Sequence, residues 1–428
     1  MKLIALINLS SIPTLKVRSV FPIGLACLAT YLEEHGHQVD IVDFLQDDES
    51  FTNLDFIEKD YDFIGLSIRN MEIDTIGGES YFPTYNNLIK RIKSKIVTGG
   101  FKTTLFFGGA GYSVFHSEID HELFDEVSIV GNGERLILEL IEGNINQKGK
   151  YVNNSNEFFR TLDIKYDHKL VKSYIQQGSK EFGLDEIGVP THRGQCVQNC
   201  IYCAYKNIES EANVYRDIKL VEKNIVALYE IGVRKIFFCD SLFNEKLEYA
   251  KAICRMICSL ELADLTWKAY FSMNIDTEFL QLLKKSRCGG IYISFDTFSE
   301  KMIHSMQKDF KPERAVQLIQ DIRQVDIPLR IFILFGGPGE CRETIKETCD
   351  FINKYLEKDE VLISLGVRVL PQSGIEALVE EKTNLLDLTF YPVGRDFVEC
   401  IIKYLNKEKI NFDNFWRLVL IQQNLLKN

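Results

Sequence analysis

The chain has 428 residues, a length that favours two or three domains over one. Its formal net charge of −11 and isoelectric point near 5.3 argue against non-specific binding to nucleic acid or to anionic membranes. No apolar run approaches the ~18 residues that a membrane span needs, and the first residues lack a signal-peptide pattern. Eight of the eleven cysteines are scattered through apolar segments, as buried small hydrophobic residues would be. We therefore expect a cytoplasmic protein that binds neither nucleic acid nor membrane.

The N-terminal part, residues 1–143, alternates short apolar runs with amphipathic stretches. Strands are predicted at residues 2–8, 38–44, 61–68, 103–109 and 126–134, and helices at residues 21–36, 81–97 and 135–143. This alternation predicts an α/β fold with a parallel sheet covered on both faces, that is, a doubly wound Rossmann-like domain. Ligands on such sheets bind beyond the C-terminal ends of the strands. Residues 144–185 are polar and rich in Asn, and we interpret them as a linker.

The alternation resumes at residue 186. Six strands are predicted, at residues 186–191, 233–239, 265–271, 289–295, 329–335 and 361–367, with helices at residues 217–232, 245–262, 277–287, 312–325 and 344–356. Residues 186–371 thus predict a partial (β/α)6 TIM-like barrel, whose active site would lie at the C-terminal ends of its strands. The extension at residues 372–428 is less regular and is expected to be mostly helical. In it, Tyr391, Arg395 and Trp416 could line a substrate pocket or pack between domains.

Three cysteines follow the first barrel strand with the spacing C-x3-C-x2-C: Cys196, Cys200 and Cys203. A zinc ion would need four ligands, and His192 is the nearest candidate for the fourth. A 4Fe–4S cluster also needs four ligands, so three thiolates leave one iron open to a small molecule. Coincidental loop cysteines are the remaining alternative. The tight spacing on a strand-end loop favours the cluster.

The stretch RGQCVQNCIYCAYK, residues 193–206, resembles the cluster motif of radical S-adenosylmethionine (SAM) enzymes, although Gln195 is an extra residue before the first cysteine. The resemblance implies a 4Fe–4S cluster whose open iron chelates SAM, with Tyr202 packed against the adenine. Residues 214–244, 267–274, 293–308 and 334–340 also match the family's pattern. They imply further SAM-binding residues, for each of which a local turn or cap role is the alternative: Asp240, Asn274, Asp296, Gly336, Gly337 and Glu340, with Arg330 facing the carboxylate.

A doubly wound domain before such a barrel resembles the cobalamin-binding domain of one radical SAM subfamily, through residues 21–44, 107–115 and 127–134. The resemblance implies cobalamin at the following strand-end residues: Gly108, Gly109, Gly111, Ser113, Gly131, Gly133 and Glu134. The loop at residues 8–20 holds no histidine, so we expect cobalamin without a histidine ligand, and we interpret His35 and His37 as surface residues. Arg69 and Asn70 are candidates for the lower cobalt face. Alternatively, Arg69 binds a loop carbonyl or carboxylate.

These resemblances imply a cobalamin-dependent radical SAM enzyme of the class B methyltransferase type. The leading hypothesis is methylation of a carbon of a small metabolite or peptide, with a 4Fe–4S cluster, SAM and cobalamin as cofactors. An external one-electron reductant of the flavodoxin or ferredoxin type would be its partner. One alternative is non-methylating radical chemistry, such as ring contraction or cyclisation, with or without cobalamin. The other is a non-enzymatic iron–sulfur redox module, which would not need an adenosyl pocket.

Overall fold

The computed structural model describes residues 1–13, 15, 20–45, 48–71, 78–119, 126–153, 155–181, 185–209, 212–380, 385–394 and 396–410, so Arg395 and Trp416 lie outside it. The described chain divides into two compact units. The first unit comprises Met1–Ile73, Ser80–Gln195 and Tyr205–Phe237, and the second is built mainly from Cys196–Ala204 and Phe238–Asn428.

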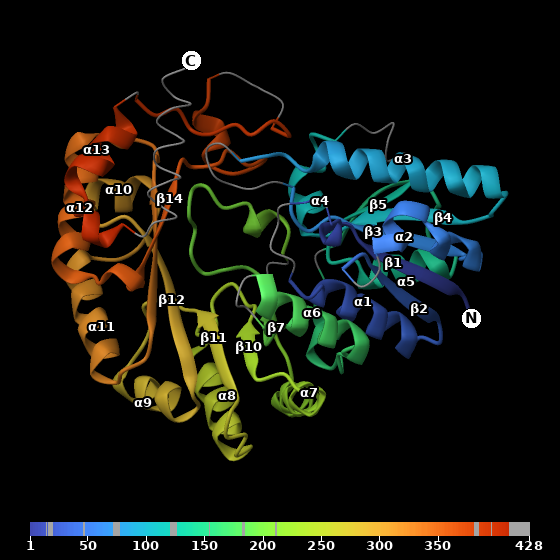
Figure 1. Cartoon of the computed structure of the whole chain (residues 1–428), viewed down its shortest axis with the longest axis horizontal. Coiled ribbons are helices and arrows are strands. Elements are labelled where there is room, and N and C mark those ends of the chain that lie inside the picture. Colours follow the sequence, from blue (N-terminus) through green and yellow to red (C-terminus); the bar gives the residue numbers. More distant parts are fainter. Residues whose placement is uncertain are drawn as a thin grey trace. The chain divides into compact units, whose positions relative to one another are not determined.

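The first unit contains a six-stranded parallel sheet in the order β2-β1-β3-β4-β5-β6 (Figure 1). Its strands are β1 (Leu3–Asn8), β2 (Gln38–Asp43), β3 (Phe63–Ser67), β4 (Thr104–Gly108), β5 (Val127–Gly131) and β6 (Gly149–Asn153). One face packs against α1 (Ile23–Glu34) and α5 (Glu134–Ile141), which share a core with alternate residues of β1. The other face is covered by α3 (Phe82–Gly99) (Figure 1). The strand order reverses at β1, which confirms the predicted doubly wound domain.

Residues 144–185, which the sequence analysis interprets as a linker, contribute regular structure to the first unit. They contain the edge strand β6 and the helix α6 (His168–Glu181). The strand has no apolar run because an edge strand of this kind leaves most of its residues exposed or half-buried. At the described residues 168–177 the helix buries Leu170, Val171 and Tyr174, a short apolar pattern within a polar stretch. Other elements of this unit include α2 (Asp48–Asn53), α4 (Ala110–Phe115), α7 (Ile218–Ile231) and the antiparallel pair β8 (His192–Arg193) and β9 (Val214–Tyr215).

A second six-stranded sheet has the order β14-β13-β12-β11-β10-β7. These strands are β7 (Glu186–Val189), β10 (Lys235–Phe238), β11 (Thr266–Tyr270), β12 (Cys288–Asp296), β13 (Leu329–Phe335) and β14 (Val361–Leu365). All six fall within or overlap the predicted strand ranges. The predicted partial (β/α)6 architecture is therefore confirmed, with one short helix, α10 (Glu300–Ser305), in addition to those expected.

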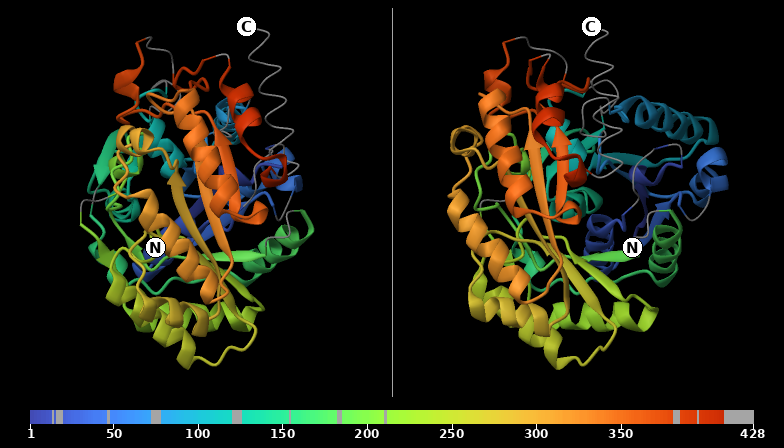
Figure 2. Two further views of the ribbon diagram at one scale, coloured as in Figure 1. Left: turned by 90° about the vertical axis from the view of Figure 1, so that its left-hand side faces the viewer. Right: turned by 60° about the vertical axis from the view of Figure 1, so that its left-hand side comes forward.

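In the second unit, one face of strands β11 to β14 is covered by helices (Figures 1 and 2). The helices are α8 (Leu247–Ser259), α9 (Thr277–Lys285), α11 (Pro312–Gln324) and α12 (Arg342–Tyr355), and α13 (Phe397–Tyr404) belongs to the C-terminal extension. Residues of β13 alternate between buried and half-buried. On the less buried face, the rings of Tyr270, Tyr292 and Phe332 contact one another with centroids 5.5–5.9 Å apart.

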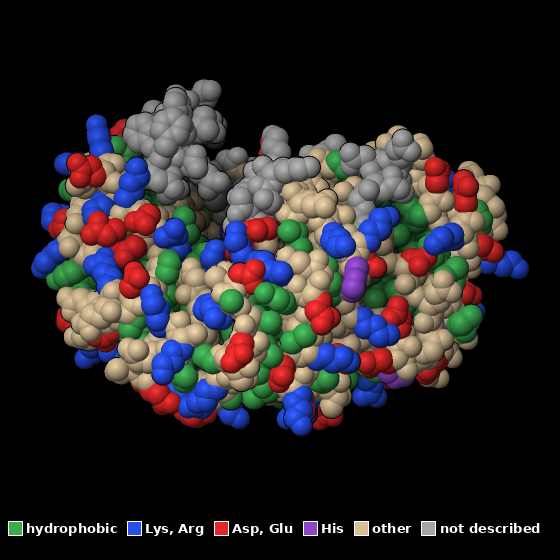
Figure 3. All heavy atoms as spheres, turned by 60° about the horizontal axis from the view of Figure 1, so that its bottom comes forward, with side chains coloured by type: hydrophobic (Ala, Val, Ile, Leu, Met, Phe, Trp, Pro, Cys, Tyr) green, Lys and Arg blue, Asp and Glu red, His purple; other side chains and the backbone are tan. Residues whose placement is uncertain are grey.

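Charges of both signs are interspersed over the face of the molecule shown in Figure 3. Ion pairs of the chain with solvent-accessible side chains include Lys2–Asp62 and Lys59–Asp40. No helix among the described residues is both long enough and apolar enough to cross a bilayer.

Candidate cluster and cofactor sites

The cysteine loop, residues 196–204, lies in the second unit and carries all three motif cysteines. Cys200 is buried, whereas Cys196 and Cys203 are half-buried, and the Cys203 amide donates to the Cys200 carbonyl across 3.1 Å. The amide of Ile201 donates to the carbonyl of Met306, so the cysteine loop lies beside the residue that follows α10. Burial raises the pKa of Cys196 to about 11, and the charges of the other two cysteines act in the same direction.

The chemistry of these donors can be compared with the two kinds of centre considered above. In the part of the chain that the structure describes, no three His, Cys, Asp or Glu side chains are already grouped tightly enough to hold a single metal ion. A 4Fe–4S cluster makes a different demand, because each thiolate binds a different iron. His192, the candidate fourth zinc ligand, is buried in the first unit with its ring 5.1 Å from that of Tyr215. Three thiols within eight residues of one loop therefore suit a cluster better than a single metal ion.

Tyr202 and Asp296, which are both predicted to contact SAM, form a hydrogen bond with each other. The Tyr202 hydroxyl donates to Asp296 Oδ2 across 2.6 Å, and Asp296 Oδ1 accepts from the Ser294 hydroxyl across 2.6 Å. Lys308 forms an ion pair with Asp296 Oδ2 at 2.6 Å, and both side chains are almost fully buried. Burial, followed by the charge of Asp296, raises the pKa of Tyr202 well above its ordinary value. The sequence analysis did not single out Ser294 or Lys308.

The turn after β13 brings together three of the predicted residues: Gly336, Gly337 and Glu340. The backbone amide of Gly336 donates to Glu340 Oε2 across 3.1 Å, and the Thr344 hydroxyl donates to Glu340 Oε1 across 2.5 Å. Burial raises the pKa of Glu340, although these two hydrogen bonds oppose the shift. A Cβ added to Gly337 would lie 2.5 Å from Met306 Sδ, so this glycine lets the end of α10 approach the turn.

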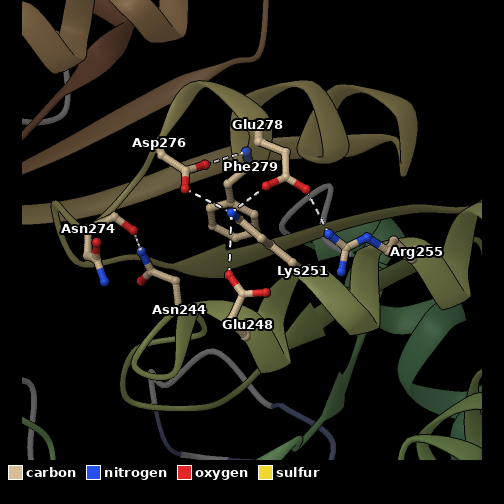
Figure 4. A network of polar contacts seen from close by, with 8 residues as sticks. All are labelled: Asn244, Glu248, Lys251, Arg255, Asn274, Asp276, Glu278 and Phe279. Atoms are coloured by element: carbon tan, nitrogen blue, oxygen red, sulfur yellow. Dashed lines mark hydrogen bonds and ion pairs between the residues drawn. The ribbon is translucent and has the colours of Figure 1, made fainter.

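The remaining predicted SAM residues have different settings. Asp240 is buried just after β10. Asn274 is exposed after β11, where its carbonyl accepts from the buried Asn244 side chain across 2.8 Å (Figure 4). Arg330 is the second residue of β13, so it starts from the end of the strand opposite to the Gly336 turn, about 17 Å along the strand.

Figure 4 also shows an ion-pair network beside Asn274, which the sequence analysis did not predict. The ammonium of Lys251, on α8, contacts Asp276 Oδ2 at 2.8 Å and Glu278 Oε2 at 2.7 Å at the beginning of α9. Asp276 is also the N-cap of α9, because its carboxylate accepts from the Phe279 amide. The network therefore fixes the start of α9 directly after the strand end that carries Asn274.

In the first unit, the predicted cobalamin residues lie at the C-terminal edge of the sheet. The pairing of Ser67 with Gly108 aligns the ends of β3 and β4, and Arg69 and Asn70 follow β3. The Asn70 carbonyl accepts from the Tyr85 hydroxyl across 2.6 Å. His35 and His37 lie between α1 and the first residue of β2, and therefore at the opposite edge of this parallel sheet.

The glycines of this edge also have roles within the chain's own packing. Gly109 has φ +102°, and a Cβ there would lie 2.4 Å from the Ile68 carbonyl oxygen. A Cβ at Gly111 would lie 2.8 Å from the Arg69 carbonyl oxygen, and one at Gly131 would lie 2.4 Å from that of Asn153. These contacts explain the glycines without a ligand, whereas a Cβ at Gly108 would have ordinary contacts only, with its nearest neighbour at 3.6 Å.

The polar residues of this edge also make internal contacts. The Ser113 hydroxyl donates to the Gly109 carbonyl and accepts from the Gly131 amide, so it joins α4 to the end of β5. Glu134, which follows Gly133 at the start of α5, binds the Arg193 guanidinium at 2.7 Å, and these side chains are 5% and 15% exposed. The Arg193 guanidinium also lies 4.3 Å from the Phe159 ring centroid. Arg193 is the first residue of the RGQC stretch, but no feature of the sequence predicts this ion pair.

Comparisons with known proteins add an independent line of evidence. Residues 191–352 match the family model described as the radical SAM superfamily. The chain is 22% identical over 281 residues to a protein of Methanocaldococcus jannaschii named as a candidate methylthiotransferase, covering 62% of this chain and 60% of the relative. It is 24% identical over 169 residues to the ribosomal protein uS12 methylthiotransferase RimO of Chlorobaculum tepidum, covering 37% and 39%. These matches span less than two thirds of each relative.

Two solved structures share the fold over most of the chain. The first is TsrM of Kitasatospora setae, a radical SAM methyltransferase with tryptophan and a SAM analogue bound. Its TM-score is 0.75 at 21% identity, covering 88% of this chain and 76% of that one. The second is OxsB, a cobalamin-dependent SAM radical enzyme with aqua-cobalamin bound. Its TM-score is 0.69 at 14% identity, covering 100% and 62%.

Proposed function

We propose that the chain is a cobalamin-dependent radical SAM enzyme that methylates a carbon of a small metabolite or peptide. The match of residues 191–352 to the radical SAM family model, together with the cysteine motif, supports this proposal. A radical SAM domain implies a 4Fe–4S cluster and SAM as cofactors. Cobalamin, the methyl transfer and the substrate class are the proposed part.

The observation that carries the proposal is the cysteine loop of the second unit. It presents three neighbouring thiols, with Cys200 buried and the loop's Tyr202 bonded to Asp296. Cys196, Cys200 and Cys203 would hold the cluster, which would supply the electron that cleaves SAM when both are bound. The chain's own residues position the reactants: the turn at Gly336 and the Glu340 carboxylate that holds it shape the end of β13.

Cobalamin is assigned to the C-terminal edge of the first sheet, beside Gly108, Arg69 and Asn70. The doubly wound topology supports this assignment, since ligands bind at this edge of such sheets. The likeness to TsrM and OxsB extends beyond residues 191–352 and supports a fold with both parts. His35 and His37 are at the opposite edge, which fits cobalamin held without either of them as a ligand. Arg69 could face the lower side of cobalt, where an always-protonated guanidinium would not bind the metal.

Methylthio transfer is the second candidate function, because the sequence relatives carry that name. It requires a sulfur source in addition to the SAM-cleaving cluster. A second iron–sulfur cluster would need several thiolates, and Cys27 is the single cysteine in residues 1–195. Cys27 is buried, and burial raises its pKa, so it is a poor thiolate ligand. This observation favours transfer of a methyl group.

The proposal is tested with the full chain purified anaerobically after expression with cobalamin. We expect bound iron, sulfide and corrinoid, SAM cleavage with a flavodoxin or ferredoxin as the reductant, and a product heavier than its substrate by one methyl group. A product heavier by a methylthio group would instead establish the second candidate. A protein that binds the cluster and cleaves SAM but retains no corrinoid would refute the cobalamin assignment alone.

The corrinoid spectrum of Arg69→Lys tests the placement of that side chain, since an unchanged spectrum would remove it from the cobalt site.

A further inference from the structure

One lysine of the second unit is buried almost completely. The side chain of Lys308 is 3% exposed, and that of its partner Asp296 is 2% exposed. Removing an ammonium from water costs several kcal/mol unless strong partners replace the water. Lys308 has two such partners, Asp296 Oδ2 at 2.6 Å and the Ser294 carbonyl at 3.2 Å. A charge held this firmly at a strand end suggests a role beyond stability.

Both oxygens of Asp296 are already used within the chain. Oδ2 accepts from Lys308 and from the Tyr202 hydroxyl, and Oδ1 accepts from the Ser294 hydroxyl. Asp296 also has φ +66°, an uncommon conformation for a residue other than glycine, which its surroundings must stabilise. Its carboxylate is thus arranged to hold Lys308 and Tyr202 in place.

The ammonium of Lys308 points toward the cysteine loop. It lies 5.7 Å from the centroid of the ring of Tyr202, two residues after Cys200. The backbone reinforces this proximity, because the Ile201 amide bonds the Met306 carbonyl two residues before Lys308. The cysteine loop and the Lys308 segment are therefore attached to each other at the backbone and at the side chains.

We propose that Lys308 is a positioning residue for the iron–sulfur cluster, which supplies a fixed positive charge beside the loop that carries Cys200. In this arrangement Asp296 orients Lys308 and holds the loop through Tyr202. The inference rests on the proposed function only in that the three cysteines must hold a cluster.

The physical consequence concerns the reduction potential. Reduction adds a negative charge to the cluster, and hydrogen bonds and positive charge near the ligand sulfurs stabilise the reduced form. Lys308 should therefore raise the potential and make the cluster easier to reduce. Loss of the Tyr202 hydroxyl should leave this charge in place but loosen the loop that carries the ligands.

The test compares three variants of the full chain, each reconstituted with iron and sulfide. Lys308→Met removes the ammonium but keeps an unbranched chain, and Lys308→Arg keeps the charge. Lys301→Met is the matched control, because Lys301 is an exposed lysine of α10. The readout is the midpoint potential of the cluster, measured by EPR-monitored redox titration without SAM.

For Lys308→Met we expect at least a tenfold lower ratio of reduced to oxidised cluster at a fixed potential, a shift of about 59 mV for one electron. Lys308→Arg and Lys301→Met should stay close to the wild type. Equal potentials for Lys308→Met and Lys301→Met would overturn the inference. If Lys308→Met assembles no cluster, the inference is tested with Tyr202→Phe instead. This variant keeps the aromatic ring and Lys308 but removes the hydroxyl that binds Asp296. It should release iron to a chelator several-fold faster than the wild type, and an equal rate would overturn the inference. A wild-type chain that binds no cluster would instead refute the proposed function.

Discussion

The two regions at strand ends that the sequence predicts to bind cofactors, one in each unit, are built in different ways. In the second unit, buried polar side chains form the region: Asp296 joins Tyr202 to Lys308, and Glu340 holds the turn at Gly336. In the first unit, close backbone contacts shape the region, because Gly109 approaches the Ile68 carbonyl where no side chain could fit, and Ser113 and the Glu134–Arg193 pair support it from beside. At a polar strand end, the residue types themselves indicate which chemistry is possible. At a glycine-rich strand end, the glycines indicate only that something packs closely against the backbone, either a ligand or the chain itself.

The largest expected effect is at the cysteine loop. Cys200→Ala removes one of three thiolates, so the protein should lose its visible cluster absorption, most of its bound iron and all SAM cleavage. Cys258→Ala is the matched control, because Cys258 is a half-buried cysteine of α8 outside the motif, and it should leave all three unchanged. Retained SAM cleavage in Cys200→Ala would show that Cys200 is not a ligand.

The next effect tests the glycine-rich region of the first unit. Gly109→Ala should lower the free energy of unfolding by about 4 kcal/mol, because the backbone has positive φ and the new Cβ would meet the Ile68 carbonyl. Gly24→Ala is the control, since nothing lies within 4 Å of a Cβ at this helical position. It should be neutral or stabilising by ~1 kcal/mol. Urea denaturation measures both.

A Gly109→Ala protein of unchanged stability that no longer retains corrinoid would assign this glycine to the ligand. A destabilised protein would assign it to packing between β3 and α4. The same substitution thus separates the two meanings of a glycine-rich strand end.

The fold was predictable where periodicity is strong. The runs at residues 61–68 and 329–335 became β3 and β13 within two residues, because both are buried strands of parallel sheets. β6 was not predictable, since an edge strand such as GKYVN needs no apolar run. The helix α6 was missed for a similar reason, because most of the side chains described at residues 168–177 are exposed or half-buried.

For the candidate site, the cysteines were found because their spacing specifies a chemistry. Lys308 was missed although it lies in a stretch that was compared with the family, because a lysine in sequence is ordinarily a surface residue. The one available signal was its place in MIHSMQK, three residues after the end of the short helix α10. Nothing in the sequence indicates that Glu134 and Arg193, 59 residues apart, would form an ion pair.

An intermediate effect is expected where a charged pair supports the glycine-rich region. Glu134→Gln leaves the Arg193 guanidinium without its carboxylate, so the free energy of unfolding should fall by about 2–3 kcal/mol. Glu139→Gln is the control on the same helix, because Glu139 pairs with Arg135 near the surface and such pairs are worth about 0.5 kcal/mol. Thermal or urea unfolding that ranks the two variants equally would contradict a structural role for the buried pair.

The smallest effect concerns pH and returns to the second unit. Burial raises the pKa of Glu340 above its ordinary value of 4.5, so the folded state binds this proton more tightly than the unfolded state does. Its contribution to stability is therefore fully present below pH 4.5 and is lost as the pH rises through the folded pKa. Glu340→Gln cannot titrate. As the pH rises above 4.5, its urea midpoint should therefore increase relative to that of the wild type. Glu343→Gln should show the opposite sign, because hydrogen bonding to Cys341 and its own backbone amide lowers the pKa of the exposed Glu343, whose contribution is lost as the pH falls. Parallel curves for the wild type and Glu340→Gln would mean that the buried carboxylate carries no desolvation cost, and that polar burial does not distinguish this strand end from the glycine-rich one.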